Sequence, residues 1–214
     1  LDGGTLLIGN ANALGSGALT AQAGTTLDSN GAFTLANAVV LDGALTLAGS
    51  HDLTLSGVIG GNGSLSKSGS ATLLLTGNSN FGGSTTVNGG TLRVTGSLGS
   101  GNVAVASGAI VGGTGSLGGM LNVADGGHLA LASGSVLSLG ALVLNDNSHI
   151  DAALGAAVPG AAGLASVAGN LTLDGRLNVS DSGGFGIGVY RLFDYGGQLT
   201  DLSLIHISEP TRPY

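Results

Sequence analysis

The chain has 214 residues, of which 43 are Gly, and it contains no Cys and no Trp. Its 8% of charged and 43% of hydrophobic residues exclude a disordered chain, and Gly does not recur every third residue as it does in collagen. Its net charge of −7, with five Lys and Arg residues and no basic cluster, excludes a face that neutralises phosphates, so we expect no nucleic-acid partner.

Short segments in which Leu or Val alternates with small residues recur along the chain. Such alternation is the period-2 pattern of a strand with one buried face. Turn residues separate the segments, and no stretch of ten residues has the 3.6-residue period of a helix. The sequence therefore predicts an all-β chain with strands at 44–48, 52–56, 72–76, 91–95, 102–106, 128–132 and 171–174.

Internal repeats decide between a sandwich and a solenoid. Residues 3–17 match residues 89–101, and residues 60–69 have a weaker counterpart at 112–121. A sandwich would need tight hairpin turns and more aromatic bulk than four Phe and three Tyr provide. We therefore predict a solenoid of about nine coils, each of roughly 20–25 residues. Gly, Asn and Ser would form its corners, where positive φ or side-chain bonds to the backbone are needed.

Residues 60–94, "GGNGSLSKSGSATLLLTGNSNFGGSTTVNGGTLRV", resemble the autotransporter-associated β-strand repeat, also called the passenger-associated transport repeat. The usual Thr-Tyr-Thr after the motif's Asn is reduced here to Phe-Gly. The resemblance implies a right-handed parallel β-helix, pectin-lyase-like, across residues 1–201. The residues that carry the motif are Gly63, Leu65, Lys67, Leu73, Leu75, Gly77, Asn80, Phe81, Gly83, Val87, Gly90, Thr91, Leu92 and Val94.

The same resemblance implies type V secretion through the outer membrane of a Gram-negative bacterium. The partner would be the protein's own C-terminal outer-membrane β-barrel, which is absent from this chain, and the chain would be cell-surface or secreted. Residues 164–201 resemble the last coils before an autochaperone region. Because the chain begins within a repeat, we expect it to be a fragment of a longer protein. Residues 202–214 lose the pattern, and we expect this tail to be non-native.

We expect a non-enzymatic, monomeric stalk with an adhesin-like surface. The sequence does not identify its host or surface ligand. The alternatives are a polysaccharide-active lyase or hydrolase and an ice- or surface-binding solenoid. An enzyme of that kind needs clustered carboxylates, whereas Asp occurs singly here and His51, His128 and His149 are isolated in sequence. An ice-binding face needs a regular Thr array, and Thr is irregularly spaced. We therefore expect no catalytic, cofactor or metal residues.

Aromatic residues gather near the C-terminal end of the pattern. The cluster comprises Phe185, Tyr190, Phe193 and Tyr195. We expect it to be a packing cluster that stiffens the last coils, and a ligand platform is the alternative. Within the same segment, Arg191 and Asp194 are three residues apart, so a strand would place them on opposite faces and prevent their pairing.

Overall fold

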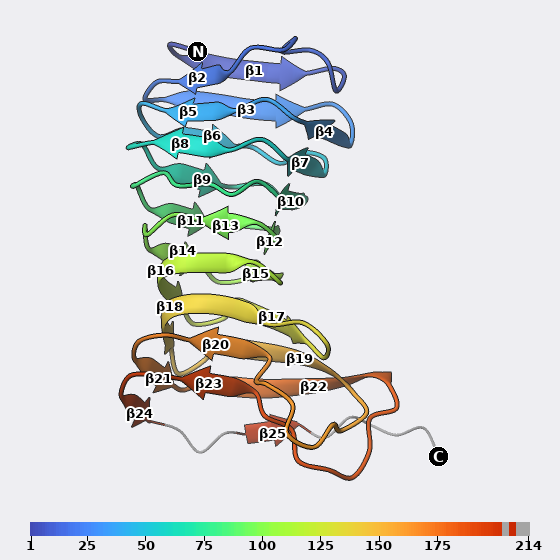
Figure 1. Cartoon of the computed structure of the whole chain (residues 1–214). Helices are drawn as coiled ribbons and strands as arrows, with labels where there is room; N and C mark the ends of the chain where they lie inside the picture. The colour runs from blue at the N-terminus through green and yellow to red at the C-terminus, as the bar shows by residue number, and fades with distance from the viewer. Residues whose placement is uncertain (203–205, 209–214) are drawn as a thin grey trace.

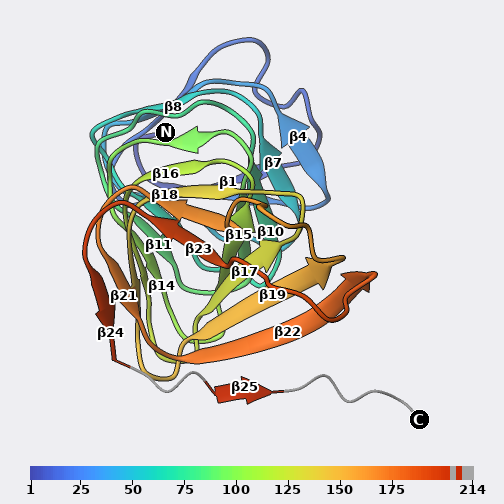
Figure 2. The ribbon, with the colours of Figure 1, turned by 60° about the horizontal axis from the view of Figure 1, so that its bottom comes forward.

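The protein is a right-handed parallel β-helix of about eight turns, close to the nine coils expected. The computed structural model describes residues 1–202 and 206–208, and within these residues it contains strands and turns but no helix. Figure 1 shows the coils stacked in chain order from one end of the rod to the other, and Figure 2 shows the strands surrounding a common interior.

Within residues 1–202 and 206–208, three sheets form the faces of the rod, and the strands in each sheet pair in parallel. The largest sheet contains β1 (Gly4–Ile8), β3 (Thr25–Ser29), β6 (Leu45–Leu47), β9 (Leu65–Lys67), β11 (Thr85–Val87), β13 (Ser97–Leu98), β14 (Val103–Val105), β16 (Ser116–Val123), β18 (Leu137–Leu144), β20 (Ala165–Val167), β21 (Leu171–Leu173), β23 (Phe193–Tyr195) and β24 (Leu199–Asp201). The second contains β4 (Phe33–Leu35), β7 (Leu53–Leu55), β10 (Thr72–Leu75), β12 (Thr91–Val94), β15 (Ile110–Gly113), β17 (His128–Ala132), β19 (His149–Gly155), β22 (Arg176–Gly183) and β25 (His206–Ser208). The third contains β2 (Leu19–Ala21), β5 (Val39–Leu41) and β8 (Ile59–Gly61).

The register gives the length of one coil. Thr25 pairs with Leu45, Leu45 pairs with Leu65, and Leu65 pairs with Thr85, so that these coils repeat every 20 residues, at the lower limit of the predicted range. Each predicted strand is present within a residue or two of its predicted limits. The long strands β16 and β18 were not predicted; each pairs with different strands along its two halves.

The core consists of columns of apolar side chains that run along the rod. In the second sheet, Leu53, Leu73, Leu92 and Val111 are in register on successive strands, and all four are buried. Burying one such side chain contributes roughly 1.5–3 kcal/mol. Because like residues stack on like, the interior is filled without the aromatic bulk that a sandwich would need.

Glycines at the corners are required mainly because successive coils approach closely. A Cβ on Gly63 would overlap the carbonyl oxygen of Gly43, and a Cβ on Gly83 would overlap that of Gly63. We predicted that corner glycines would be needed for a positive φ. Neither Gly63 nor Gly83 has a positive φ, so that prediction was wrong at these positions. The predicted reason holds at Gly90, whose φ is 61°.

The expected off-pattern tail, residues 202–214, lies mostly outside the described residues. Its described part includes β25, which pairs in parallel with β22 through three residues. The boundary at residue 201 stays a prediction. In the part of the chain that the structure describes, no helix is long and apolar enough to cross a membrane.

Candidate functional site

The residues of the repeat motif lie in the core and at the corners rather than on the outer faces. Asn80 is exposed, and Thr91, at the start of β12, is half-buried. The four motif glycines occupy turns between strands. Besides Gly77, the buried members are Leu65, Lys67, Leu73, Leu75, Phe81, Val87, Leu92 and Val94. The motif therefore specifies how a coil packs, and it leaves the outward side chains to other uses.

Phe81 is the largest apolar side chain of the motif and is 2% exposed. The backbone N–H groups on either side of it, at Asn80 and Gly82, donate to the carbonyls of Ile59 and Gly61. Phe81 therefore lies one coil beyond Gly61, at the same corner. A Cβ on Gly61 would overlap the carbonyl oxygen of Leu41, so the close approach of the preceding coil requires glycine there. Phe81 is the sole aromatic residue among the buried apolar residues that the structure describes.

Lys67 is a buried cation, 1% exposed, at the next corner. Its Nζ donates to the carbonyl of Gly69 at 2.6 Å and to that of Gly89, one coil further, at 3.1 Å. Burial lowers the pKa of Lys67, and the charge of Asp52 opposes that effect. The side chain thus joins two coils through carbonyls that would otherwise lack donors, which is a structural role.

Outward side chains of β17, β19 and β22 form a polar cluster. His128 Nδ1 lies 2.7 Å from Asp151 Oδ2, and Asn178 Nδ2 donates to Asp151 Oδ1 at 2.7 Å. The rings of His128 and His149 stack with centroids 4.5 Å apart, and Asn178 Nδ2 lies 3.2 Å from His149 Nδ1. The expectation that these histidines are isolated was wrong. His128 and His149 are backbone partners, and their spacing of about one coil was the signal.

A carboxylate beside a histidine can orient an imidazole as a general base. In this cluster, Asp151 holds His128 and Asn178 on an open face of the sheet, with His128 and Asp151 about one-third exposed. Among the described residues, no group of three or more His, Cys, Asp or Glu side chains could hold a metal ion. The cluster can accept and donate hydrogen bonds to a polar ligand.

The irregular spacing of Thr in the sequence becomes regular in space on the largest sheet. Outward positions in register on β1, β3, β6, β9 and β11 are Thr5, Thr26, Thr46, Ser66 and Thr86. Beyond β11, the next strand has Ala104 at this position. The column thus presents one hydroxyl per coil over five successive strands, and it is a single column rather than a flat array.

The corner that follows each strand of the second sheet changes along the rod. A ladder of glycines, Gly57, Gly77, Gly96 and Gly115, keeps the first coils close there, because a Cβ on each of the last three would overlap the preceding one's carbonyl oxygen. Past Gly115 the ladder ends, and the loops at this corner lengthen to 156–164 after β19 and 184–192 after β22. These two loops and residues 133–136 line a solvent-open cavity of about 550 Å³.

The four aromatic residues do not form one buried cluster. The rings of Phe185 and Tyr190 lie 5.1 Å apart in the loop beside the cavity, whereas Phe193 and Tyr195 lie on β23. Tyr195 is 48% exposed, and the other three rings are half-buried against the core. Their role as a packing cluster stays a prediction, and the position of Tyr190 in the cavity wall favours the ligand alternative.

Arg191 and Asp194 do form an ion pair, which corrects the expectation that they could not. Arg191 Nη1 lies 3.2 Å from Asp194 Oδ1. Only Asp194 lies on β23; Arg191 precedes the strand, so the alternation of faces does not apply to it. Asp194 also accepts a hydrogen bond from the backbone N–H of Gly163 at 2.8 Å, which ties the loop 156–164 to β23.

Comparisons with known proteins agree with this architecture. Residues 65–94 match the family described as the passenger-associated-transport-repeat. The chain is also 45% identical over 83 residues to the "Adhesin BmaC autotransporter" of Brucella suis biovar 1 (strain 1330). That alignment covers 36% of this chain, and the chain spans about 2% of the length of that relative. Residues 65–94 of this β-helix therefore form one passenger-associated transport repeat, and part of the chain is similar to an autotransporter adhesin.

Proposed function

We propose that the chain is a non-enzymatic stalk of an autotransporter passenger that forms or displays an adhesive surface outside the cell. The observation that carries the proposal is the place of the passenger repeat, whose side chains build the core and corners of a β-helix. The similarity to an autotransporter adhesin supports the same function. In this proposal the rod is monomeric, and the protein's own outer-membrane barrel exports it through a Gram-negative outer membrane.

Adhesion of beads coated with the purified chain tests the proposal. We expect such beads to bind mammalian epithelial cells or wells coated with matrix proteins, and soluble folded chain to compete with them. Chain unfolded by heat should not compete, because the surface exists only in the coiled state. Equal binding by beads coated with folded and unfolded chain would contradict an adhesive role of the rod.

A polysaccharide-active enzyme is the second candidate, favoured by the polar cluster around Asp151. A general base of the His128–Asp151 kind could abstract a proton from a sugar ring lying across the second sheet. The test is release of unsaturated or reducing sugars from pectin and alginate. Turnover that disappears in Asp151→Asn and persists in Asp125→Asn, which alters an exposed turn residue outside the cluster, would establish this candidate over the stalk.

Surface binding through hydroxyls is the third candidate, favoured by the column from Thr5 to Thr86. Thermal hysteresis of ice growth in the presence of the protein would detect it. A Thr46→Val and Thr86→Val double variant keeps the shape of the column and removes two hydroxyls. A hysteresis that this variant weakens would favour ice binding.

A further inference from the structure

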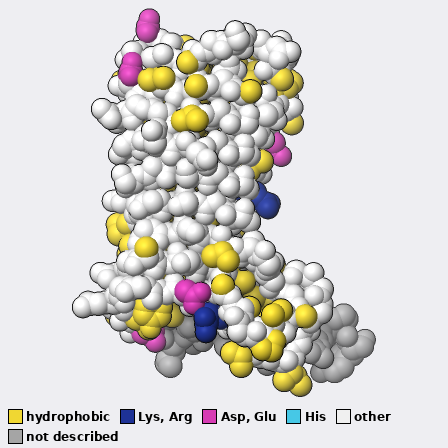
Figure 3. Space-filling model, viewed as in Figure 1, with side chains coloured by type: hydrophobic (Ala, Val, Ile, Leu, Met, Phe, Trp, Pro, Cys, Tyr) yellow, Lys and Arg dark blue, Asp and Glu magenta, His cyan; other side chains and the backbone are white. Residues whose placement is uncertain are grey.

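The two long loops beside the cavity have an unusual composition for exposed segments. Residues 156–164 read "AAVPGAAGL" and residues 184–192 read "GFGIGVYRL", so Arg191 is the sole charged residue in either loop. Val158 is 61% exposed, Ile187 108% and Val189 90%. Figure 3 shows hydrophobic side chains gathered over the lower right of the molecule. Contiguous apolar surface of this kind marks a site of interaction.

Hydrogen bonds hold the base of the loops in place. Tyr190 Oη donates to the carbonyl of Gly155 at 3.2 Å and accepts from the backbone N–H of Gly186 at 3.1 Å. The backbone N–H of Gly155 in turn donates to Ser133 Oγ at 2.9 Å. With the bond from Gly163 to Asp194, each segment of the wall is fixed to a neighbouring one, so the cavity is formed before anything binds.

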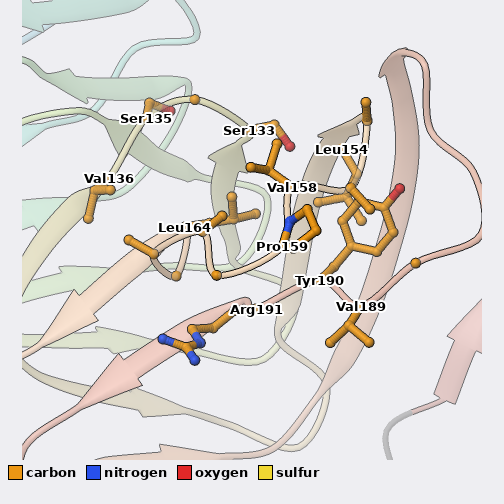
Figure 4. A pocket seen from close by; sticks show the side chains of 18 of the residues that line it. Ser133, Ser135, Val136, Leu154, Val158, Pro159, Leu164, Val189, Tyr190 and Arg191 are labelled. Carbon is orange, nitrogen blue, oxygen red and sulfur yellow. The ribbon is translucent and has the colours of Figure 1, made fainter.

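The size and lining of the cavity define the class of ligand. Its volume of about 550 Å³ falls within the range of small-molecule sites. Leu154, Val158, Leu164 and Tyr190 contribute apolar wall, and Arg191 is the one charged residue among the described residues that line it. Figure 4 shows the apolar side chains between the loops and Arg191 at the edge of the group.

We propose that this cavity binds a small anionic amphiphile, with the apolar body against Leu154, Leu164 and Tyr190 and the anionic group at Arg191. A guanidinium has five N–H donors, and Asp194 takes up one of them at 3.2 Å, so others are left for a carboxylate or sulfonate. This inference goes beyond the proposed adhesive function and does not depend on it.

Fluorescence titration of the full chain with 8-anilinonaphthalene-1-sulfonate tests the proposal. This probe carries an aromatic body and one sulfonate, and we expect saturable binding at one site that decanoate, below its micelle concentration, displaces. Val158→Asp places a charge in the apolar wall at an exposed loop position, and we expect it to weaken binding about tenfold. Val189→Asp, on the other loop, is the second variant. Val58→Asp is the matched control, because Val58 is 46% exposed and lies outside the cavity.

Arg191→Gln tests the anionic part of the proposal separately. We expect it to weaken the sulfonate probe several-fold and to leave the affinity for neutral Nile red unchanged. Thermal melts by circular dichroism check that each variant remains folded. The proposal is overturned if the probe does not bind, if Val58→Asp weakens it as much as Val158→Asp and Val189→Asp do, or if Arg191→Gln affects both probes equally. Binding to anionic lipid vesicles without binding of soluble decanoate would also overturn it, because the site would then recognise a membrane. None of these outcomes bears on adhesion by coated beads.

Discussion

Phe81→Ala should destabilise the rod more than any other single aromatic truncation in the described residues. Phe81 is 2% exposed, and it is the sole aromatic residue among the buried apolar residues that the structure describes. Truncating a buried Phe to Ala costs about 3–5 kcal/mol, and the cost is highest where the cavity cannot collapse. Because each coil is held by its neighbours, the loss should spread to the coils on both sides.

Equilibrium unfolding in urea, followed by circular dichroism, measures the effect. Tyr195→Ala is the matched control: its ring is 48% exposed, so its truncation should cost less than about 1 kcal/mol. Phe81→Leu, which keeps most of the volume, should fall between the two. If Phe81→Ala costs no more than Tyr195→Ala, the ring does not fill the interior as described, and the packing argument is refuted.

Three further perturbations probe the corners and the charges. Gly83→Ala should lower the free energy of unfolding by about 1–3 kcal/mol, because the added Cβ would overlap a backbone carbonyl; Gly3→Ala, with no neighbour within 4 Å, should be near neutral, and equal urea midpoints for the two would contradict the close approach of coils. Burial lowers the pKa of Lys67 despite the charge of Asp52, so the unfolded chain binds more protons between that lowered pKa and 10.5. The free energy of unfolding should therefore contain a component that rises with pH across this window, and Lys67→Met should lack it; parallel pH profiles would argue against the burial. Desolvation raises the pKa of Asp28, but hydrogen bonds from the backbone and side chain of the next coil outweigh it and hold the pKa below 3.8. That stabilisation is present above pH 3.8 and is lost as the pH falls through the folded-state pKa, so Asp28→Asn should flatten the acid limb of the unfolding curve, and an unchanged limb would refute it.

The sequence predicts most of the architecture, because alternation and repeat length are local properties. Strands such as 128–132 were predicted at the limits the structure gives, since each needs only the period-2 pattern. The reason for the corner glycines was partly wrong, because close approach between coils at Gly63 depends on the register and not on the local turn. The sequence predicted a range of coil lengths, and such a range does not say which residues of successive coils pair.

The polar cluster and the cavity were missed for the same physical reason. His128 and His149 become neighbours only once the coil length is known to a residue, and a range of 20–25 residues does not align them. The loops 156–164 and 184–192 break the strand pattern, so their apolar residues had no assigned place. Both sites are formed by residues from different coils. The alternation of residues along one strand does not show which residues of other coils lie beside it.

The ladder of glycines that ends at Gly115 divides the rod into a part whose corner tolerates no added atoms and a part whose corner tolerates long loops. Where the ladder runs, the backbones are so close that an added residue or methyl group at this corner would push whole coils apart. After it ends, the same corner accepts nine-residue excursions such as 156–164 while β18 and β20 still pair beneath it. Substitutions and insertions in these loops can therefore change the exposed surface at this end of the rod without changing how its strands pair. A protein with this arrangement can acquire new binding surfaces while its fold stays the same.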